Sequence, residues 1–335
     1  MRYRELGQSG IEASVVGLGA WAIGGWMWGG TDENESILAI HAALDAGINL
    51  IDTAPIYGFG RSEQIVGKAI RDRRDQVVLA TKCSMVCNPT VGHFKFRSDA
   101  AGPNPNGHIT IHIYAGPESL RQEVESSLLR LQVDHIDLLQ THWQDTTTPI
   151  AETMECLLDL KSQGKIRAIG ACNASAEQLK QYCEVSPLDT DQEKFSLVNR
   201  DIEQDQLPFC RENNVAVLAY SPLGRGLLTG KIGPEREFTP GDQRAVDPMF
   251  SVGNRKRVAD MIAQWQPLLE THSLTPAQLT TAWTAAQPGL THVLCGIRTV
   301  QQATENAAAG DIELTAEELN IIDDSYEQYV ATATT

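Results

Sequence analysis

Four polar residues of this 335-residue chain stand where short apolar runs end, and their side chains are of types that move protons. Asp52 ends the run INLID, Tyr57 follows five residues later, Lys82 ends VVLATK, and His142 ends IDLLQTH. An ammonium group at the end of an apolar run needs an anionic partner to offset its desolvation. Asp52 on a neighbouring strand would supply that partner, so we interpret the four residues as one acid–base site.

Eight apolar runs alternate with amphipathic runs along the chain, which predicts alternating strands and helices. The predicted strands are VVGLG (residues 15–19), INLID (48–52), VVLATK (77–82), IDLLQTH (136–142), IRAIGAC (166–172), LDTDQ (188–192), VAVLAYS (215–221) and THVLCG (291–296). Buried parallel strands need helical crossovers, and eight such units close into a barrel whose active site lies at the strands' carboxyl ends. The predicted fold class is therefore α/β, a (β/α)8 TIM barrel formed by residues 1–335 as a single domain.

A doubly wound nucleotide-binding sheet is the competing interpretation. Gly17-Leu-Gly19-Ala-Trp-Ala22 matches the loose G-x-G-x-x-A pattern after a strand. The helix that this pattern requires is missing, because four more glycines follow and helix signals begin only at Thr31. We therefore interpret the glycines as a loop in which the backbone closely approaches a ligand.

Several segments lie outside the eightfold pattern. Residues 2–13 resemble a short hairpin that would plug the bottom of the barrel, residues 254–270 predict one helix, and residues 316–330 predict an extra terminal helix. Long loops at the carboxyl face are expected at residues 83–116 and 222–253. In the first of these, HFKF (93–96) and ITIHIY (109–114) alternate around a Gly- and Pro-rich turn. This predicts a β-hairpin over the carboxyl face whose removal leaves thermal stability nearly intact.

Charge and cysteine content exclude several classes of protein. Lys and Arg number 27 against 43 Asp and Glu, a net charge of −16, which disfavours nucleic-acid and anionic membrane partners. The uncharged run at residues 13–31 contains six glycines, which argues against a membrane span. Seven scattered cysteines and the absence of a secretory signal predict a cytoplasmic location. No metal is expected, because His108 and His112 alternate as in a strand, too far apart for one ion.

The ordered motifs resemble those of the aldo-keto reductase family over essentially the whole chain. They are DTAPIYGFGRSEQIVGKAI (52–70), ATK (80–82), THWQD (141–145), IGACN (169–173), Gln192, YSPLGRGLLTGK (220–231) and CGIRTVQQATEN (295–306). The resemblance implies hydride transfer between a nicotinamide and a carbonyl carbon, with Tyr57 as proton donor. It also implies that Lys82, steadied by Asp52, lowers the pKa of Tyr57, and that His142 orients the carbonyl oxygen.

The same resemblance implies a set of NADP(H) contacts. They are Gly19, Trp21, Asp52, Cys172, Asn173, Gln192, Tyr220, Ser221, Leu223, Gly224, Arg225, Lys231, Arg244, Gly296, Arg298, Gln302 and Asn306. Arg298 at the adenosine end suits a 2′-phosphate, which favours NADP over NAD. The chain departs from the family at Cys172, often a serine, and at Gly296 and Gln302, where some members carry basic residues; this weakens the preference for NADP.

The expected substrate is a small carbonyl compound or its alcohol. Trp21, Trp28, Tyr57, His142 and Trp143 are expected to line its site. Two alternatives stay open at this point. One is a sugar or polyol dehydrogenase that works mainly in the oxidative direction, and the other is a redox-sensing partner like the channel β-subunits of this family. The sequence leaves the oligomeric state open.

Overall fold

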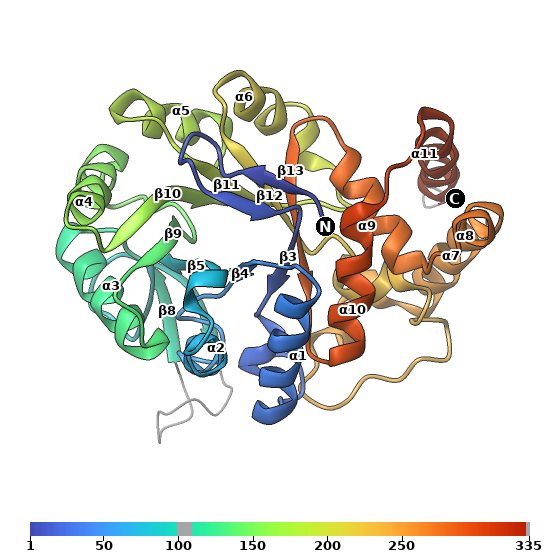
Figure 1. Cartoon of the computed structure of the whole chain (residues 1–335), viewed down its shortest axis with the longest axis horizontal. Coiled ribbons are helices and arrows are strands. Elements are labelled where there is room, and N and C mark those ends of the chain that lie inside the picture. Colours follow the sequence, from blue (N-terminus) through green and yellow to red (C-terminus); the bar gives the residue numbers. More distant parts are fainter. Residues whose placement is uncertain (99–108, 333–335) are drawn as a thin grey trace.

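Eight parallel strands form a closed barrel in the computed structural model, which describes residues 1–98 and 109–332. Each barrel strand pairs with the next one along the chain, and the last strand pairs with the first. The strands are β3 (Val16–Gly19), β4 (Leu50–Asp52), β5 (Val78–Cys83), β9 (Ile136–Thr141), β10 (Ile166–Cys172), β11 (Thr190–Lys194), β12 (Ala216–Tyr220) and β13 (Leu290–Gly296). The predicted TIM barrel is confirmed, and Figure 1 shows helices surrounding it.

One helix follows each barrel strand and covers the outside of the barrel. These helices are α1 (Glu33–Asp45), α2 (Arg61–Ile70), α3 (Pro117–Leu131), α4 (Ile150–Ser162), α5 (Ala176–Val185), α6 (Gln206–Glu212), α9 (Pro276–Ala286) and α10 (Val300–Ala308). Side-chain caps mark several of their starts. Ser175 and Thr275 each form a capping box with a glutamine three residues on, which satisfies backbone N–H groups that the first turn leaves free.

The bottom of the barrel is closed by the predicted hairpin. Strands β1 (Tyr3–Glu5) and β2 (Glu12–Ser14) pair antiparallel. Leu6, Ile11 and Ala13 pack into an apolar cluster with inward-facing side chains of the barrel strands. The hairpin therefore seals the amino end and leaves the carboxyl end as the open face.

The segment after β12 differs from expectation. Residues 254–270 were expected to form one helix, but α7 (Val252–Ala263) and α8 (Gln266–His272) are separate. Pro267 lies in the first turn of α8, where its missing N–H group costs nothing and its ring blocks continuation from the preceding turn. The extra terminal helix is confirmed as α11 (Ala316–Ala331). No helix within the described residues is long and apolar enough to span a bilayer.

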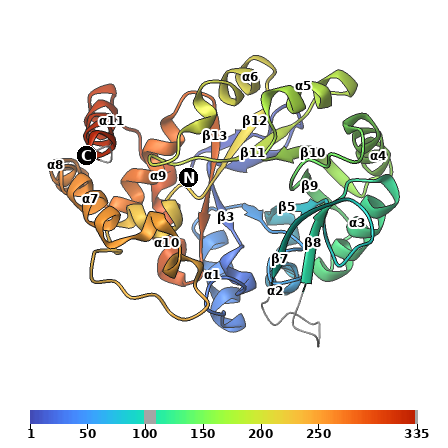
Figure 2. The ribbon, with the colours of Figure 1, turned by 180° about the vertical axis from the view of Figure 1, so that it is seen from behind.

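The loop after β5 contains a small antiparallel sheet of three strands. The predicted pair is present as β7 (His93–Ser98) and β8 (Ile109–Ile113), and β6 (Met85–Cys87) adds a strand that we did not predict. The turn of the predicted hairpin lies outside the described residues. Figures 1 and 2, seen from opposite sides, place this sheet and the β1–β2 hairpin on opposite faces of the barrel.

The apolar side of this sheet belongs to the core at the carboxyl face. Ile109, Ile111 and Ile113 are buried and cluster with Ala54 and Ile56 from the loop after β4. The expectation that residues 93–112 can be removed at little cost to stability conflicts with this packing. The reason is that β8 is the central strand and its isoleucines cover the barrel mouth.

Replacing Ile111 with alanine should lower the free energy of unfolding by about 2–5 kcal/mol, because the side chain is fully buried and leaves a cavity. Urea denaturation followed by circular dichroism measures the change. Phe94→Ala is the matched control on β7, since that ring is 58% exposed and its loss should cost within about 0.5 kcal/mol. Equal effects of both variants would show that β8 is not part of the core.

Candidate active site

A buried ion pair forms the centre of the site. Lys82 Nζ donates a hydrogen bond to Asp52 Oδ2 at 2.6 Å, and the two side chains are 1% and 4% exposed. Asp52 is the last residue of β4 and Lys82 lies near the end of the adjacent β5, so parallel pairing of the two strands brings them together. The predicted contact between Lys82 and Asp52 is therefore confirmed.

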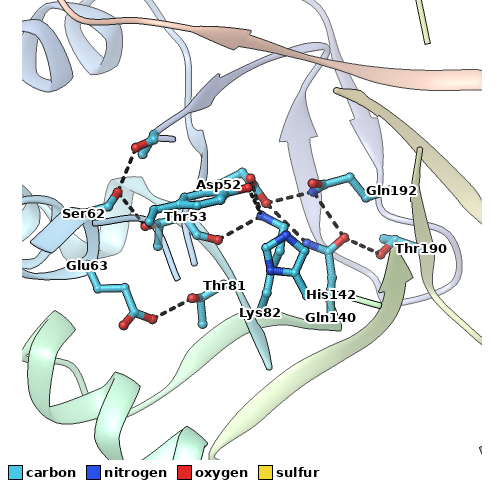
Figure 3. Close-up of polar contacts among 12 residues, drawn as sticks. Asp52, Thr53, Ser62, Glu63, Thr81, Lys82, Gln140, His142, Thr190 and Gln192 are labelled. Atoms are coloured by element: carbon cyan, nitrogen blue, oxygen red, sulfur yellow. Dashed lines mark hydrogen bonds and ion pairs between the residues drawn. The ribbon is translucent and has the colours of Figure 1, made fainter. Parts of the chain in front are cut away.

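Tyr57 lies against this pair. Lys82 Nζ also donates to the Tyr57 hydroxyl at 3.2 Å and to the Thr53 backbone carbonyl at 3.0 Å, so its donors have three acceptors. The His142 ring lies edge-on to the Tyr57 ring, with centroids 5.8 Å apart. Figure 3 shows Lys82, Asp52 and His142 converging from neighbouring strand ends. The structure therefore brings all four predicted residues together.

Two glutamines hold the other side of the aspartate. Gln192 Nε2 donates to Asp52 Oδ1 at 2.8 Å, and Gln140 Nε2 approaches the same oxygen at 3.4 Å (Figure 3). Gln192 was expected to bind the nicotinamide carboxamide, whereas here its amide N–H supports the carboxylate. Its side chain still borders the cavity described below.

Asn173 links His142, which directly follows β9, to Tyr220 at the end of β12. Its amide donates to the His142 backbone carbonyl at 3.0 Å, and its oxygen accepts from the Tyr220 hydroxyl at 2.8 Å. Its backbone φ is 55°, a left-handed conformation that asparagine tolerates better than most residues. The loop after β10 is therefore held in a fixed geometry beside the site.

Burial and charge together set the protonation states. Burial raises the pKa of Tyr57 to about 12, although the Lys82 charge works in the opposite direction. The expected net lowering of this pKa is therefore wrong for the protein alone, because desolvation of the phenolate outweighs the ammonium. Burial opposes the charge of Lys82, but Asp52 and Tyr57 more than offset this and raise its pKa. Burial, with Lys82 and Lys95, lowers the pKa of His142 well below its ordinary value, so the imidazole is neutral at pH 7.

A layer of buried polar contacts fixes the strand ends from behind. Glu63 on α2 accepts hydrogen bonds from Thr81 Oγ1 at 2.7 Å and from Arg130 Nε at 2.6 Å. Ser62 donates to the Ala20 carbonyl at 2.9 Å and contacts the Thr53 hydroxyl (Figure 3). These contacts tie β3, β4 and β5 to α2 and α3, so the residues carrying Asp52 and Lys82 have little freedom to move.

An elongated cavity runs from this centre across the barrel mouth to the start of α10. Most of the predicted cofactor contacts line it: Gly19, Trp21, Asp52, Gln192, Tyr220, Ser221, Leu223, Arg225, Lys231, Arg244, Gly296, Arg298, Gln302 and Asn306. Tyr57 and Trp28 line it as well. Cys172, Asn173, Gly224, His142 and Trp143 are not part of its wall. The Cys172 side chain is 1% exposed and points into packed structure, which explains its absence.

The cations along the cavity differ in their partners. Lys231 pairs with Glu305 at 2.8 Å, Arg225 with Asp247, and Arg244 with Asp242. Arg298 instead donates to two backbone carbonyls, those of Gly30 at 2.6 Å and Trp28 at 3.4 Å. No carboxylate among the described residues forms a salt bridge with Arg298, although its charge helps to lower the pKa of Asp242.

Sequence patterns did not predict part of this wall. Glu305 borders the cavity, and its Oε1 is buried with no hydrogen-bond partner among the described residues. It lies in the same motif as Gln302 and Asn306, and an acidic residue one helical turn after Gln302 was the signal that could have identified it. Trp28 and Asp242 form an isolated antiparallel bridge, which joins the loop after β3 to the loop after β12 at the cavity.

Comparison with known proteins agrees with this geometry. The Aldo/keto reductase family model matches residues 15–327. The chain belongs to the aldo/keto reductase family. The chain is 43% identical over 320 residues to the NADH-specific methylglyoxal reductase of Escherichia coli, covering 94% of this chain and 95% of that protein. It is 44% identical over 301 residues to an aldo-keto reductase of Bacillus subtilis, covering 89% and 85% of the two chains.

Solved structures of aldo/keto reductases share the fold over nearly the whole length. A glycerol dehydrogenase from Gluconobacter oxydans superposes with a TM-score of 0.85 at 39% identity, covering 98% of this chain and 95% of that one. An aldo/keto reductase from Klebsiella pneumoniae, in complex with NADP and acetate, superposes with a TM-score of 0.70 at 28% identity, covering 94% and 92%. Enzymes of this family are oxidoreductases that act on carbonyl compounds with a nicotinamide cofactor.

Lys82→Met should lower the free energy of unfolding by about 3–5 kcal/mol, because it leaves the Asp52 carboxylate buried without its counter-charge. Chemical denaturation of the single variants and of Asp52→Asn/Lys82→Met measures this. The double variant should lose less than the sum of the two single losses, since neither charge is then left alone. Additive losses would mean that the pair is not coupled.

Proposed function

We propose that this protein is an NADP(H)-dependent oxidoreductase that interconverts a small aldehyde or ketone and its alcohol, with Tyr57 as the proton donor. The observation that carries the proposal is the position of Lys82 Nζ. It contacts both the Asp52 carboxylate and the Tyr57 hydroxyl at the wall of a cavity that extends to Arg298.

Each side chain of the site then has one task. A bound nicotinamide would supply the hydride that reaches the carbonyl carbon. Tyr57 donates its hydroxyl proton to the carbonyl oxygen, and Lys82 stabilises the phenolate that remains. The neutral imidazole of His142 donates a hydrogen bond to the same oxygen and orients it. Asp52 keeps Lys82 charged in a buried setting, and Gln192 holds Asp52 in place.

The cavity wall suits a dinucleotide along its length. Tyr220 offers a flat ring at the nicotinamide end, beside the Asp52 and Tyr57 side chains. At the opposite end, a Cβ atom added to Gly296 would meet no atom within 4 Å, so the wall leaves open space there. The unpartnered Glu305 Oε1 offers an acceptor for a hydroxyl or amino group, and Arg298 offers a cation for a phosphate.

The substrate would enter beside an aromatic wall. Trp21 lies with its ring 6.2 Å from that of Tyr57 and packs edge-on against Trp28 at 5.3 Å. Trp143 packs in the same apolar cluster as Tyr57. We propose Trp21, Trp28 and Trp143 as substrate contacts, which suits small carbonyl compounds.

The second candidate function is a sugar or polyol dehydrogenase that works mainly in the oxidative direction. The similarity to the glycerol dehydrogenase of Gluconobacter oxydans favours it, since the same side chains serve both directions. A redox-sensing channel partner has no observation in its favour. A single domain over residues 1–335 and a cytoplasmic location stay predictions.

Tyr57→Phe should cut turnover by a factor of about 10² to 10⁴, because the phenyl ring keeps the packing and removes the proton donor. Steady-state oxidation of NADPH with methylglyoxal and butanal measures this loss. Cofactor affinity, followed by NADPH fluorescence, should stay near that of the parent. Turnover within about tenfold of the parent would refute the role of Tyr57.

The pH dependence of the two reaction directions provides a separate test of Tyr57 as the proton donor. Reduction needs the protonated phenol, and burial raises the pKa of Tyr57 to about 12, so kcat/KM for reduction should stay flat through neutral pH. Alcohol oxidation needs the phenolate and should rise about tenfold per pH unit over the same range. A reduction rate that falls as pH rises through about 6 to 7 would instead indicate a protonated histidine as the donor.

Arg298→Ala should weaken NADPH binding by about 10- to 100-fold and NADH binding much less, because only NADPH carries the 2′-phosphate. Fluorescence titration with both cofactors measures the ratio of affinities. Lys231→Ala is the matched control, since Glu305 already neutralises that lysine and the ratio should change less. Equal loss for both cofactors, or a parent enzyme that prefers NADH, would contradict the assignment of NADP(H).

A further inference from the structure

A second lysine stands beside the active site and takes no part in the mechanism above. Lys95 on β7 holds its ammonium 3.3 Å from the centre of the Trp143 ring. Within residues 1–98 and 109–332 no carboxylate or hydrogen-bond acceptor contacts this ammonium. An amino group held over an aromatic face keeps its other donors free for a ligand.

A β-bulge in the small sheet sets the direction of the Lys95 side chain. Phe94 pairs with His112 and Phe96 pairs with Ile111, so Lys95 is an extra residue in a β-bulge. In a regular strand, Phe94 and Phe96 would share one face. Here Phe94 is 58% exposed, while Phe96 stacks on Trp26 at 6.0 Å in the carboxyl-face cluster. Bulges next to active sites commonly redirect a side chain, and this one directs Lys95 onto Trp143.

Trp143 connects the lysine to the reacting groups. It follows His142 directly in the chain and packs in the same apolar cluster as Tyr57. The Lys95 charge is close enough to contribute to the lowered pKa of His142. A ligand group that reaches Lys95 would therefore lie on the substrate side of Tyr57, away from the elongated cavity to which we assign the cofactor.

The charged groups near Lys95 have other partners, so its positive charge is not offset locally among the described residues of this acidic protein. Lys82 and Asp52 neutralise each other. Asp145 turns its carboxylate to the backbone N–H groups of Ala115 and Thr147, and its Oδ1 lies 3.5 Å from His93 Nδ1. The net charge of −16 would repel an anionic substrate from most of the surface, so one exposed ammonium at the mouth has a large effect on which substrates approach.

We propose that Lys95 is a specificity-determining residue that binds an anionic group, a carboxylate or a phosphate, on the far end of the carbonyl substrate. The substrate class is then acidic aldehydes or ketones, whose neutral end reaches Tyr57 and His142. This inference rests on the proposed function of the site.

The test compares matched pairs of substrates. Succinic semialdehyde and butanal differ in a carboxylate, and glyceraldehyde 3-phosphate and glyceraldehyde differ in a phosphate. For at least one pair, Lys95→Met should lower the ratio of kcat/KM for the anionic to the neutral member by about tenfold, the size of one charge-assisted hydrogen bond. Lys95→Arg should keep most of the ratio, and added salt should reduce it in the parent. The pair that responds identifies the anion.

Lys180→Met on α5 removes the same charge from an exposed position and is the control for net charge. It should leave both ratios unchanged. Unchanged ratios in Lys95→Met, with normal turnover of the neutral substrates, would overturn the role of Lys95 and leave the proposed function standing.

A second measurement does not depend on turnover. Butyrate and inorganic phosphate are titrated against the parent, and tryptophan fluorescence follows the environment of Trp143. A saturable change that Lys95→Met abolishes supports the anion site even if no carbonyl is reduced, an outcome that would refute only the proposed function. Absence of any change with both anions in the parent would overturn the site.

Discussion

The buried ion pair between Lys82 and Asp52 is the constraint on which the carboxyl face of this barrel depends. Each charge alone would carry a large desolvation penalty, so both must stay within hydrogen-bond distance and have their remaining polar atoms satisfied. Thr53 and Tyr57 take the other donors of the lysine, and Gln192 donates to the second oxygen of the aspartate. The closed barrel meets these demands because parallel pairing of β4 and β5 fixes the two strand ends side by side.

The barrel separates this polar cluster from an apolar floor. Inward-facing residues at the lower end, such as Leu50 and Leu218, pack with Leu6 of the closing hairpin. The polar inward-facing residues gather toward the carboxyl ends of the strands, where a loop can bring further groups to them. A tyrosine on the loop after β4 therefore reaches the lysine without crossing the core, and its high pKa follows from its own burial.

Much of this arrangement could be predicted from the sequence, because a strand buried on both faces is a continuous apolar run and a polar residue at its end stands out. Asp52, Lys82 and His142 were found in this way. Other features depend on contacts distant in sequence. The partner of Gln192 and the sign of the shift in the pKa of Tyr57 depend on how tightly the barrel packs. The bulge at Lys95 depends on the register of two strands whose alternation looks regular in the sequence.

Two features that were hard to predict, the orphan oxygen of Glu305 and the bulge at Lys95, belong to residues that we propose to contact ligands. The barrel strands supply the ion pair, and its chemistry does not distinguish one small carbonyl compound from another. Three of the ligand contacts that we propose come from segments outside the ring of strands: Arg298 reaches the loop after β3, Glu305 lies on α10, and Lys95 lies on an inserted sheet. Relatives named as an NADH-specific methylglyoxal reductase and as a glycerol dehydrogenase match this chain over nearly its whole length. We therefore expect differences in specificity across such similar barrels to arise at loop positions, where a single charge can be gained or lost without disturbing the buried pair.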